Sequence, residues 1–199
     1  MTKHLRRHDY VAMPWRNGGG VTYEIAREPQ AGTEFTWRLS LALIECSGPF
    51  SSFAGYQRAI ALVSGDGCLL HGIEQQPVSL RKTGDLKLFP GGVAVACELV
   101  RGPCCDLNLM IREPGSIIAA RHISLAPGES GPLLAGCDNA VFCLEGELEC
   151  IDTTSGREIA LGLHDTFVMT CDATGSWELR NRGTTRIQLL AFAWRNGDR

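Results

Sequence analysis

Alternation of apolar and polar residues dominates this chain, and it predicts strands. Apolar side chains alternate with polar or small ones over residues 35–44 and again over residues 106–112, which is the period of a strand with one buried face. No window of the sequence sustains the i, i+3, i+4, i+7 apolar spacing of an amphipathic helix. Twenty-three glycines and nine prolines supply the tight turns that many short strands need. The pattern therefore predicts an all-β protein, closer to a barrel or jelly roll than to an α/β sheet.

An internal repeat divides the pattern into two halves. The stretch RAIALVSGDGCL, which begins at Arg58, aligns with NAVFCLEGELEC, which begins at Asn139, at an offset of 81 residues. A repeat of that length predicts two tandem barrels. The turn sequence at residues 113–116 is the expected boundary. This gives an N-terminal barrel at 1–112 that carries the pocket and a C-terminal barrel at 113–199, with the terminal strands free to cross between barrels.

The stretch from Ser51 to Gly65 carries the strongest chemical signal. Arg58 stands at the start of a predicted strand, with Ile60 and Leu62 on the same face. A guanidinium therefore lies on the inward row of an otherwise apolar strand. Such an arginine is either a ligand anchor or half of a buried ion pair, for which the candidate acids are Glu24, Glu45 and Asp106.

The spacing around this strand resembles the two sequence motifs of the cupin superfamily. The motifs are Arg58-x6-Gly65 and the Gly-x5-Pro-x-Gly stretch from Gly84 to Gly92. Where a metal-binding cupin has two histidines, a glutamate and a third histidine, this chain has Ser51, Phe53, Arg58 and Val95. These side chains are poor ligands for a transition metal, and an arginine in place of a carboxylate favours an anion. We therefore expect a cupin barrel with no metal and no cofactor.

A glycine-rich block precedes the predicted barrel strands. Residues 14–20 read PWRNGGG, and three consecutive glycines require an unusual backbone conformation or a close approach of other atoms. The block lacks the Lys-Ser/Thr of a phosphate-binding P-loop. Trp15 and Asn17 either cap the pocket or brace the mouth of the barrel. The complete set of predicted ligand-binding residues is Arg58, Trp15, Asn17, Glu24, Arg38, Ser40, Ser51 and Phe53.

The same block carries a family resemblance. It is followed by Thr22, Glu24-Ile25, Trp37-Arg38, Phe50-Ser-x-Phe53 and Asp106-x-Asn108-x-Met110. Together these resemble the HutD/Ves family of bacterial two-cupin proteins over about residues 15–192. The resemblance implies a bicupin fold. For the HutD branch it implies a regulatory or accessory role in histidine utilisation through binding of a small carboxylate such as urocanate, formiminoglutamate or formylglutamate. For the Ves branch it implies a role in cold and stress response.

Composition limits which binding partners and which cellular compartment we expect for this chain. A net charge of −3 gives no reason to expect nucleic acid or an acidic membrane as a partner. The polar, basic start at residues 1–7 does not resemble a signal peptide. Nine cysteines without a C-x-x-C pair are typical of small core residues in a reducing compartment. We expect a cytoplasmic monomer or homodimer.

Two other classes of function compete with metabolite binding. The first is a metal-independent cupin enzyme of the isomerase, epimerase or lyase type, acting on a small anionic substrate. Its acid–base candidates are Tyr23, Glu24 and Tyr56, but adjacent residues on a strand point to opposite faces. No catalytic residue is therefore assigned. The second is an interaction scaffold, which would tie Arg58 into a dry ion pair and leave no open cavity.

Overall fold

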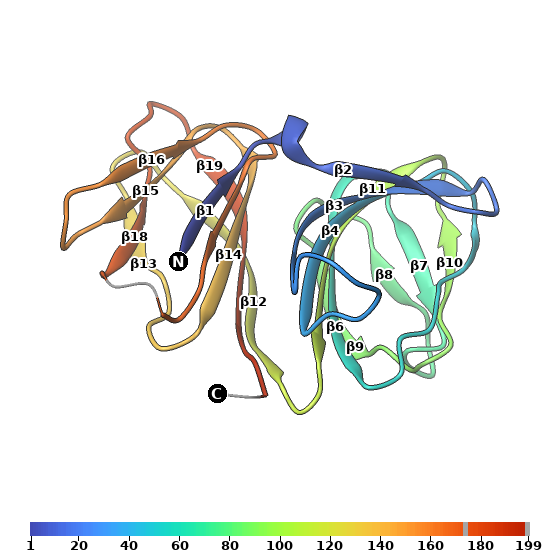
Figure 1. The fold of residues 1–199 in the computed structure, drawn as a ribbon. Helices are drawn as coiled ribbons and strands as arrows, with labels where there is room; N and C mark the ends of the chain where they lie inside the picture. Colours follow the sequence, from blue (N-terminus) through green and yellow to red (C-terminus); the bar gives the residue numbers. More distant parts are fainter. Residues whose placement is uncertain (173–174, 198–199) are drawn as a thin grey trace. The chain divides into compact units, whose positions relative to one another are not determined.

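A computed structural model of the chain describes residues 1–172 and 175–197 and shows an all-β protein (Figure 1). Apart from one short 3-10 helix, η1 (Arg7–Asp9), the regular elements that it describes are strands. The all-β fold class predicted from the alternating pattern is thus confirmed. Within the described ranges, no helix is long and apolar enough to cross a membrane.

The chain divides into two compact units, and the first is Tyr10–Ile117 with residues 196 and 197. Its larger sheet has the order β2 (Val11–Pro14), β3 (Gly20–Glu28), β4 (Trp37–Ile44), β11 (Cys104–Arg112), β6 (Tyr56–Gly65) and β9 (Leu86–Pro90). Its smaller sheet has the order β5 (Gly48–Pro49), β10 (Ala96–Leu99), β7 (Cys68–His71) and β8 (Val78–Leu80). The two sheets face each other in Figure 1, which is the arrangement of a jelly roll.

The second unit consists of Met1–Asp9 and Ile118–Arg195. One sheet has the order β1 (Thr2–Leu5), β17 (Thr166–Met169), β14 (Asp138–Glu145), β19 (Ile187–Arg195) and β12 (Ser116–Leu125). The other has the order β13 (Ser130–Pro132), β18 (Trp177–Arg180), β15 (Leu148–Asp152) and β16 (Glu158–Leu161). The first strand of the chain therefore belongs to the sheet of the C-terminal strands. The domain boundary between residues 112 and 113 stays a prediction, and residues 173, 174, 198 and 199 of the predicted C-terminal barrel lie outside the described residues.

The sequence repeat corresponds to equivalent strand positions in the two units. Arg58 on β6 lies opposite Met110 on β11 and Phe89 on β9. Asn139 on β14 lies opposite Ala193 on β19 and Met169 on β17. The same three-strand arrangement thus occurs in both units, as the repeat in the sequence indicates.

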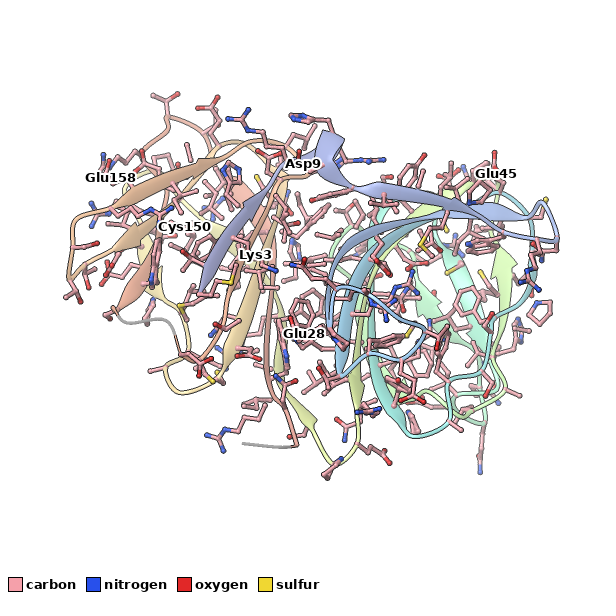
Figure 2. All side chains as sticks on the ribbon, in the orientation of Figure 1. Lys3, Asp9, Glu28, Glu45, Cys150 and Glu158 are labelled. Atoms are coloured by element: carbon pink, nitrogen blue, oxygen red, sulfur yellow. The ribbon has the colours of Figure 1, made fainter. Side chains whose placement is uncertain are left out.

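Each unit encloses an apolar core between its two sheets. In the first unit the core includes Ile60 and Leu62, the side chains that follow Arg58 on the inward row of β6. In the second unit the core includes Cys150, which is fully buried (Figure 2). All nine cysteines are free thiols, and most of them are buried.

Candidate functional site

A cavity of about 420 Å³ opens into the first unit beside its larger sheet. The volume lies in the range of small-molecule sites. Side chains from β3, β4, β6 and β11 line it together with the segments around Trp15 and Phe50. Seven of the eight predicted ligand-binding residues line this cavity: Trp15, Asn17, Arg38, Ser40, Ser51, Phe53 and Arg58.

Strand register explains why polar side chains meet here. On β4, Arg38, Ser40 and Ala42 point into the cavity, while the alternate residues of the strand point to the opposite face of the sheet. Ser40 lies opposite Asn108 on β11, and Arg38 lies opposite Met110 on the same strand. One face of the sheet thus changes from polar at the cavity to apolar in the core.

Arg58 lines the cavity and is only 5% exposed. Its Nη2 donates to Asn108 Oδ1 at 2.8 Å, and its Nη1 donates to the Ser51 carbonyl oxygen at 3.5 Å. Its Nε is buried and has no hydrogen-bond partner among the described residues. Within the same part of the chain, Arg58 forms no ion pair. This guanidinium therefore keeps unused capacity to donate hydrogen bonds.

Three phenyl rings surround the guanidinium of Arg58. Its Cζ lies 5.0 Å from the ring centroid of Phe89, 5.6 Å from that of Phe50 and 5.7 Å from that of Phe53. Ring faces attract a cation, but they replace water poorly as hydrogen-bond acceptors. Burial lowers the pKa of Arg58 to about 10; Asp106 opposes this shift and Arg38 adds to it. The arginine stays charged at neutral pH, in a place where its charge is costly.

Asp106 and Asn108 extend the site away from Arg58. Asn108 donates from Nδ2 to Asp106 Oδ1 and accepts from Arg58 at Oδ1, so the amide connects the cation to the carboxyl group. Asp106 is 1% exposed. Burial raises the pKa of Asp106 to about 7, against the opposing effects of Arg58 and of the hydrogen bond from Asn108. Asp106 is thus a titratable group within the physiological pH range.

Glu24 has a different position from the other predicted ligand-binding residues. It is not among the residues that line the cavity; instead its Oε2 accepts a hydrogen bond from Arg38 Nε at 2.7 Å. Arg27 lies 4.0 Å from the same oxygen. Glu24 therefore balances the charge of Arg38 at the edge of the cavity, and a contact with a ligand stays a prediction.

The glycine-rich block forms the turn that carries Trp15 and Asn17. Trp15 Nε1 donates to Thr22 Oγ1 at 2.8 Å, and Asn17 Oδ1 accepts from the Gly19 amide at 3.1 Å. A Cβ on Gly20 would lie 2.3 Å from the carbonyl oxygen of Leu43 and 3.2 Å from the Trp15 ring. Only glycine fits that close approach. The turn both braces β3 against β4 and places an indole at the cavity.

Ser51 and Phe53 come from the segment before β6. Ser51 contributes its carbonyl oxygen to Arg58. The amide of Phe53 donates to the Gly91 carbonyl oxygen at 2.8 Å, which fixes the segment beside the loop after β9. The Phe53 ring packs near Phe35 and Tyr56, with ring centroids 6.4 Å and 6.2 Å apart. Phe53 is therefore an aromatic wall of the cavity.

Sequence reasoning assigned no site role to Asn108 or Asp106. From the sequence, Asp106 is a candidate only for the ion-pair partner of Arg58, whereas the structure places Asn108 between the two side chains. A signal was available, because Asp106, Asn108 and Met110 occupy alternate positions of a strand whose other face is apolar. A polar row on a strand buried on both faces indicates a site.

The described side chains give no sign of a metal centre. Across residues 1–172 and 175–197, no group of three or more His, Cys, Asp or Glu side chains is arranged to hold a metal ion. The cavity instead presents arginine, amide, hydroxyl, thioether and aromatic groups together with one buried acid. Such a lining suits an organic anion.

Comparison with known proteins places this geometry in a family. The chain is 48% identical over 163 residues to an uncharacterised 21.2 kDa protein encoded in the hutC 3′ region of Pseudomonas putida, a match that covers 81% of this chain and 83% of that protein. It is 38% identical over 99 residues to the protein Ves of Citrobacter koseri, over 49% of this chain and 51% of that protein.

Solved structures agree with these sequence matches. A conserved protein of unknown function from Pseudomonas aeruginosa PAO1 matches with a TM-score of 0.87 and 28% identity, over 98% of this chain and 100% of that chain. HutD from Pseudomonas fluorescens SBW25, in a formate condition, matches with a TM-score of 0.77 and 31% identity, over 98% and 99%. Lactobacillus farciminis oxalate decarboxylase matches at 8% identity with a TM-score of 0.71, over 98% and 88%, and shows the cupin-type fold alone. The HutD family model matches residues 7–187, and the chain belongs to the HutD family.

Proposed function

We propose that this protein binds a small carboxylate-bearing metabolite in the cavity of its first unit, as a regulatory or accessory protein of histidine degradation. The observation that carries the proposal is Arg58, a nearly buried arginine that lines a cavity and has no ion-pair partner in the described part of the chain. A buried cation without a counter-ion is costly. A bound carboxylate would supply that counter-ion through charge-assisted hydrogen bonds.

The surroundings of Arg58 support a planar organic acid. The phenyl rings of Phe50, Phe53 and Phe89 surround the guanidinium of Arg58, which is only 5% exposed. An ionic hydrogen bond is stronger in such a poorly hydrated place. The bonds to Asn108 and to the Ser51 carbonyl oxygen use one N–H on each Nη atom of Arg58, so the remaining N–H groups of the two Nη atoms can bind a carboxylate with two parallel hydrogen bonds. Trp15 offers a flat apolar surface to the remainder of the ligand.

The pathway assignment comes from the relatives. One relative is named for the hutC region and one structural match is named HutD. Urocanate, formiminoglutamate and formylglutamate are the candidate ligands, since each carries a carboxylate and fits a cavity of about 420 Å³. The Ves similarity extends over about half of the chain, so a stress-response role is the weaker alternative.

Asp106 favours one second candidate, a metal-independent isomerase, epimerase or lyase. A cavity-lining acid whose pKa is about 7 is suited to general acid–base catalysis. This hypothesis predicts that a carbon-bound proton of a ligand exchanges with deuterated solvent in the presence of the protein and does not exchange with Asp106→Asn, as followed by NMR.

The direct test is a calorimetric titration of the EDTA-treated protein with urocanate, formiminoglutamate, formylglutamate and formate. We expect saturable binding of at least one ligand, and a loss of at least about 100-fold in affinity for Arg58→Ala, since two charge-assisted hydrogen bonds contribute about 3 kcal/mol or more. Circular dichroism verifies that the variant is folded.

The matched control is Arg112→Ala. Arg112 lies on the same strand as Asn108, pairs with Glu34 and is 42% exposed at its side chain, so its removal should leave binding within about twofold. An absence of heat from all four ligands, with Arg58→Ala clearly less stable, would assign Arg58 to a structural role and contradict the proposal.

A further inference from the structure

The lining of the cavity holds two buried opposite charges, Arg58 and Asp106, when Asp106 is ionised. The amide of Asn108 separates them, and they form no direct ion pair in the described structure. If an anion joined Arg58 while Asp106 stayed ionised, three buried charges would sum to −1. Burial of a net charge is unfavourable, so the site needs one further positive charge or one proton.

Among the described residues, Arg58 on β6 is the one cation whose charge acts on Asp106, and it is the cation that the anion itself would bind. Two other arginines line the cavity. Arg38 on β4 is paired with Glu24, and Arg16 is exposed, so that solvent screens its charge. On the core side lie the thiols of Cys68 on β7 and Cys104 on β11. The hydrogen bond with Cys68 and burial raise the pKa of Cys104. For Cys68 the hydrogen bond with Cys104 lowers the pKa, but the one with Cys97 and burial raise it to about 12, so both thiols are neutral.

We propose that Asp106 is a further residue of the anion site and that the cavity takes up its anion together with one proton, which Asp106 holds. This inference rests on the proposed function, because it concerns the same ligand. The protonated carboxyl group restores the charge balance and gains a hydrogen-bond donor. Asn108 positions both groups, since its amide oxygen faces Arg58 and its amide nitrogen faces Asp106.

The direction of the pH dependence follows from linkage. The pKa of Asp106 is about 7 before the ligand binds, and a bound anion raises it further because it cancels the field of Arg58 and adds a negative charge. Below pH 6 Asp106 is already protonated, so affinity does not change with pH. Above pH 7 binding must take a proton from solvent. We expect the dissociation constant to rise about tenfold between pH 6 and pH 8.

The experiment is calorimetry with formylglutamate, urocanate and formate at pH 6 and pH 8, each in two buffers of different ionisation enthalpy. The dependence of the observed heat on the buffer gives the number of protons taken up. We expect close to one proton at pH 8 and close to none at pH 6 for the unmodified protein. The variant Asp106→Asn, which keeps an acceptor for Asn108, should bind with the same affinity at both pH values and take up one proton fewer at pH 8. The difference between the two proteins removes the titration of the ligand itself.

Asp66→Asn is the matched control, because Asp66 is an exposed carboxylate of the same unit and its removal should leave proton uptake unchanged. Binding at pH 8 without proton uptake, in the unmodified protein, overturns this inference and leaves the proposed function intact. Binding of none of the three probes at either pH overturns both. The measurement on the unmodified protein decides the matter even if Asp106→Asn does not fold.

Discussion

The two units of this protein have the same strand arrangement, but they differ in the side chains that face inward from equivalent strands. In the first unit Arg58, Asn108 and Asp106 face a cavity of about 420 Å³. In the second, the register places Asn139, Ala191 and Leu189 at the equivalent positions. Asn139 and Ala191 line a cavity of only about 40 Å³. The same backbone arrangement thus supports a polar site in one unit and a packed interior in the other.

The residue at the position of Arg58 accounts for much of the difference. In the second unit this residue is Asn139, whose Nδ2 donates hydrogen bonds to the nearby carbonyl oxygens of Leu134 and Cys137 at 2.8 Å and 3.0 Å. Arg58 is too long and too strongly charged to be satisfied in that way, and its Nε has no partner among the described residues. The polar atoms of Asn139 are thus bonded within its own unit, whereas those of Arg58 are only partly bonded.

The largest effect on stability is expected when an acidic residue is introduced into the core of the second unit. Leu189→Asp places a carboxylate at the position equivalent to Asp106, in a core without an arginine on the neighbouring strand position. Burial without a partner shifts a carboxyl pKa by several units, and the leucine contacts are lost as well. We expect a loss of about 6 kcal/mol, enough to unfold the unit.

Urea denaturation followed by tryptophan fluorescence measures this loss. Leu163→Asp, at a position that is 60% exposed in the same unit, should change stability by less than about 0.5 kcal/mol. If Leu189→Asp were as stable as the unmodified protein, the packed interior would not distinguish the two units.

A smaller effect is expected from the pH dependence of the polar unit. The pKa of Asp106 is raised in the folded protein from 3.8 to about 7, so between these values the folded state holds a proton that the unfolded state has released. Stability from this group is complete below about pH 4 and is lost as pH rises to about 7. Relative to the unmodified protein, Asp106→Asn should therefore gain up to about 4 kcal/mol across this window and no more above it.

Denaturant titrations of both proteins at several pH values provide the comparison. If the difference in unfolding free energy between the two proteins were constant from pH 4 to pH 8, Asp106 would be ionised in the folded protein throughout this range. The first unit would then lack the buried acid of raised pKa that distinguishes it from the second. Glu34→Gln is a suitable control, since the carboxylate of Glu34 is 82% exposed.

The smallest effect is expected at Asn139. Asn139→Ala removes two hydrogen bonds to carbonyl oxygens and should cost about 1 kcal/mol of unfolding free energy. Because Asn139 lies in the unit without the proposed site, ligand binding measured by calorimetry should not change. A loss of binding would show that the second unit takes part in the function, and the distinction between the units would have to be revised.

The strand pattern and the repeat made much of the site predictable. The cupin motif spacing and the buried position of Arg58 identified the cavity strand, and seven predicted residues line the cavity. Glu24 was harder to place, because its pairing with Arg38 depends on which strands are neighbours. A β-bulge between Glu24 and Ala26 also shifts the register of β3 against β4. The alternating sequence pattern does not predict such a bulge.

By itself the sequence determined the all-β class, the two-barrel repeat, the arginine that replaces a metal ligand and the family. These follow from period, spacing and residue type, which are local properties of a chain. Only the tertiary structure decided that Asn108 stands between Arg58 and Asp106, and that the cavity beside Arg58 has about 420 Å³ whereas the one beside Asn139 has about 40 Å³. The reason is physical: charge balance and cavity volume depend on distances between strands that lie far apart in sequence.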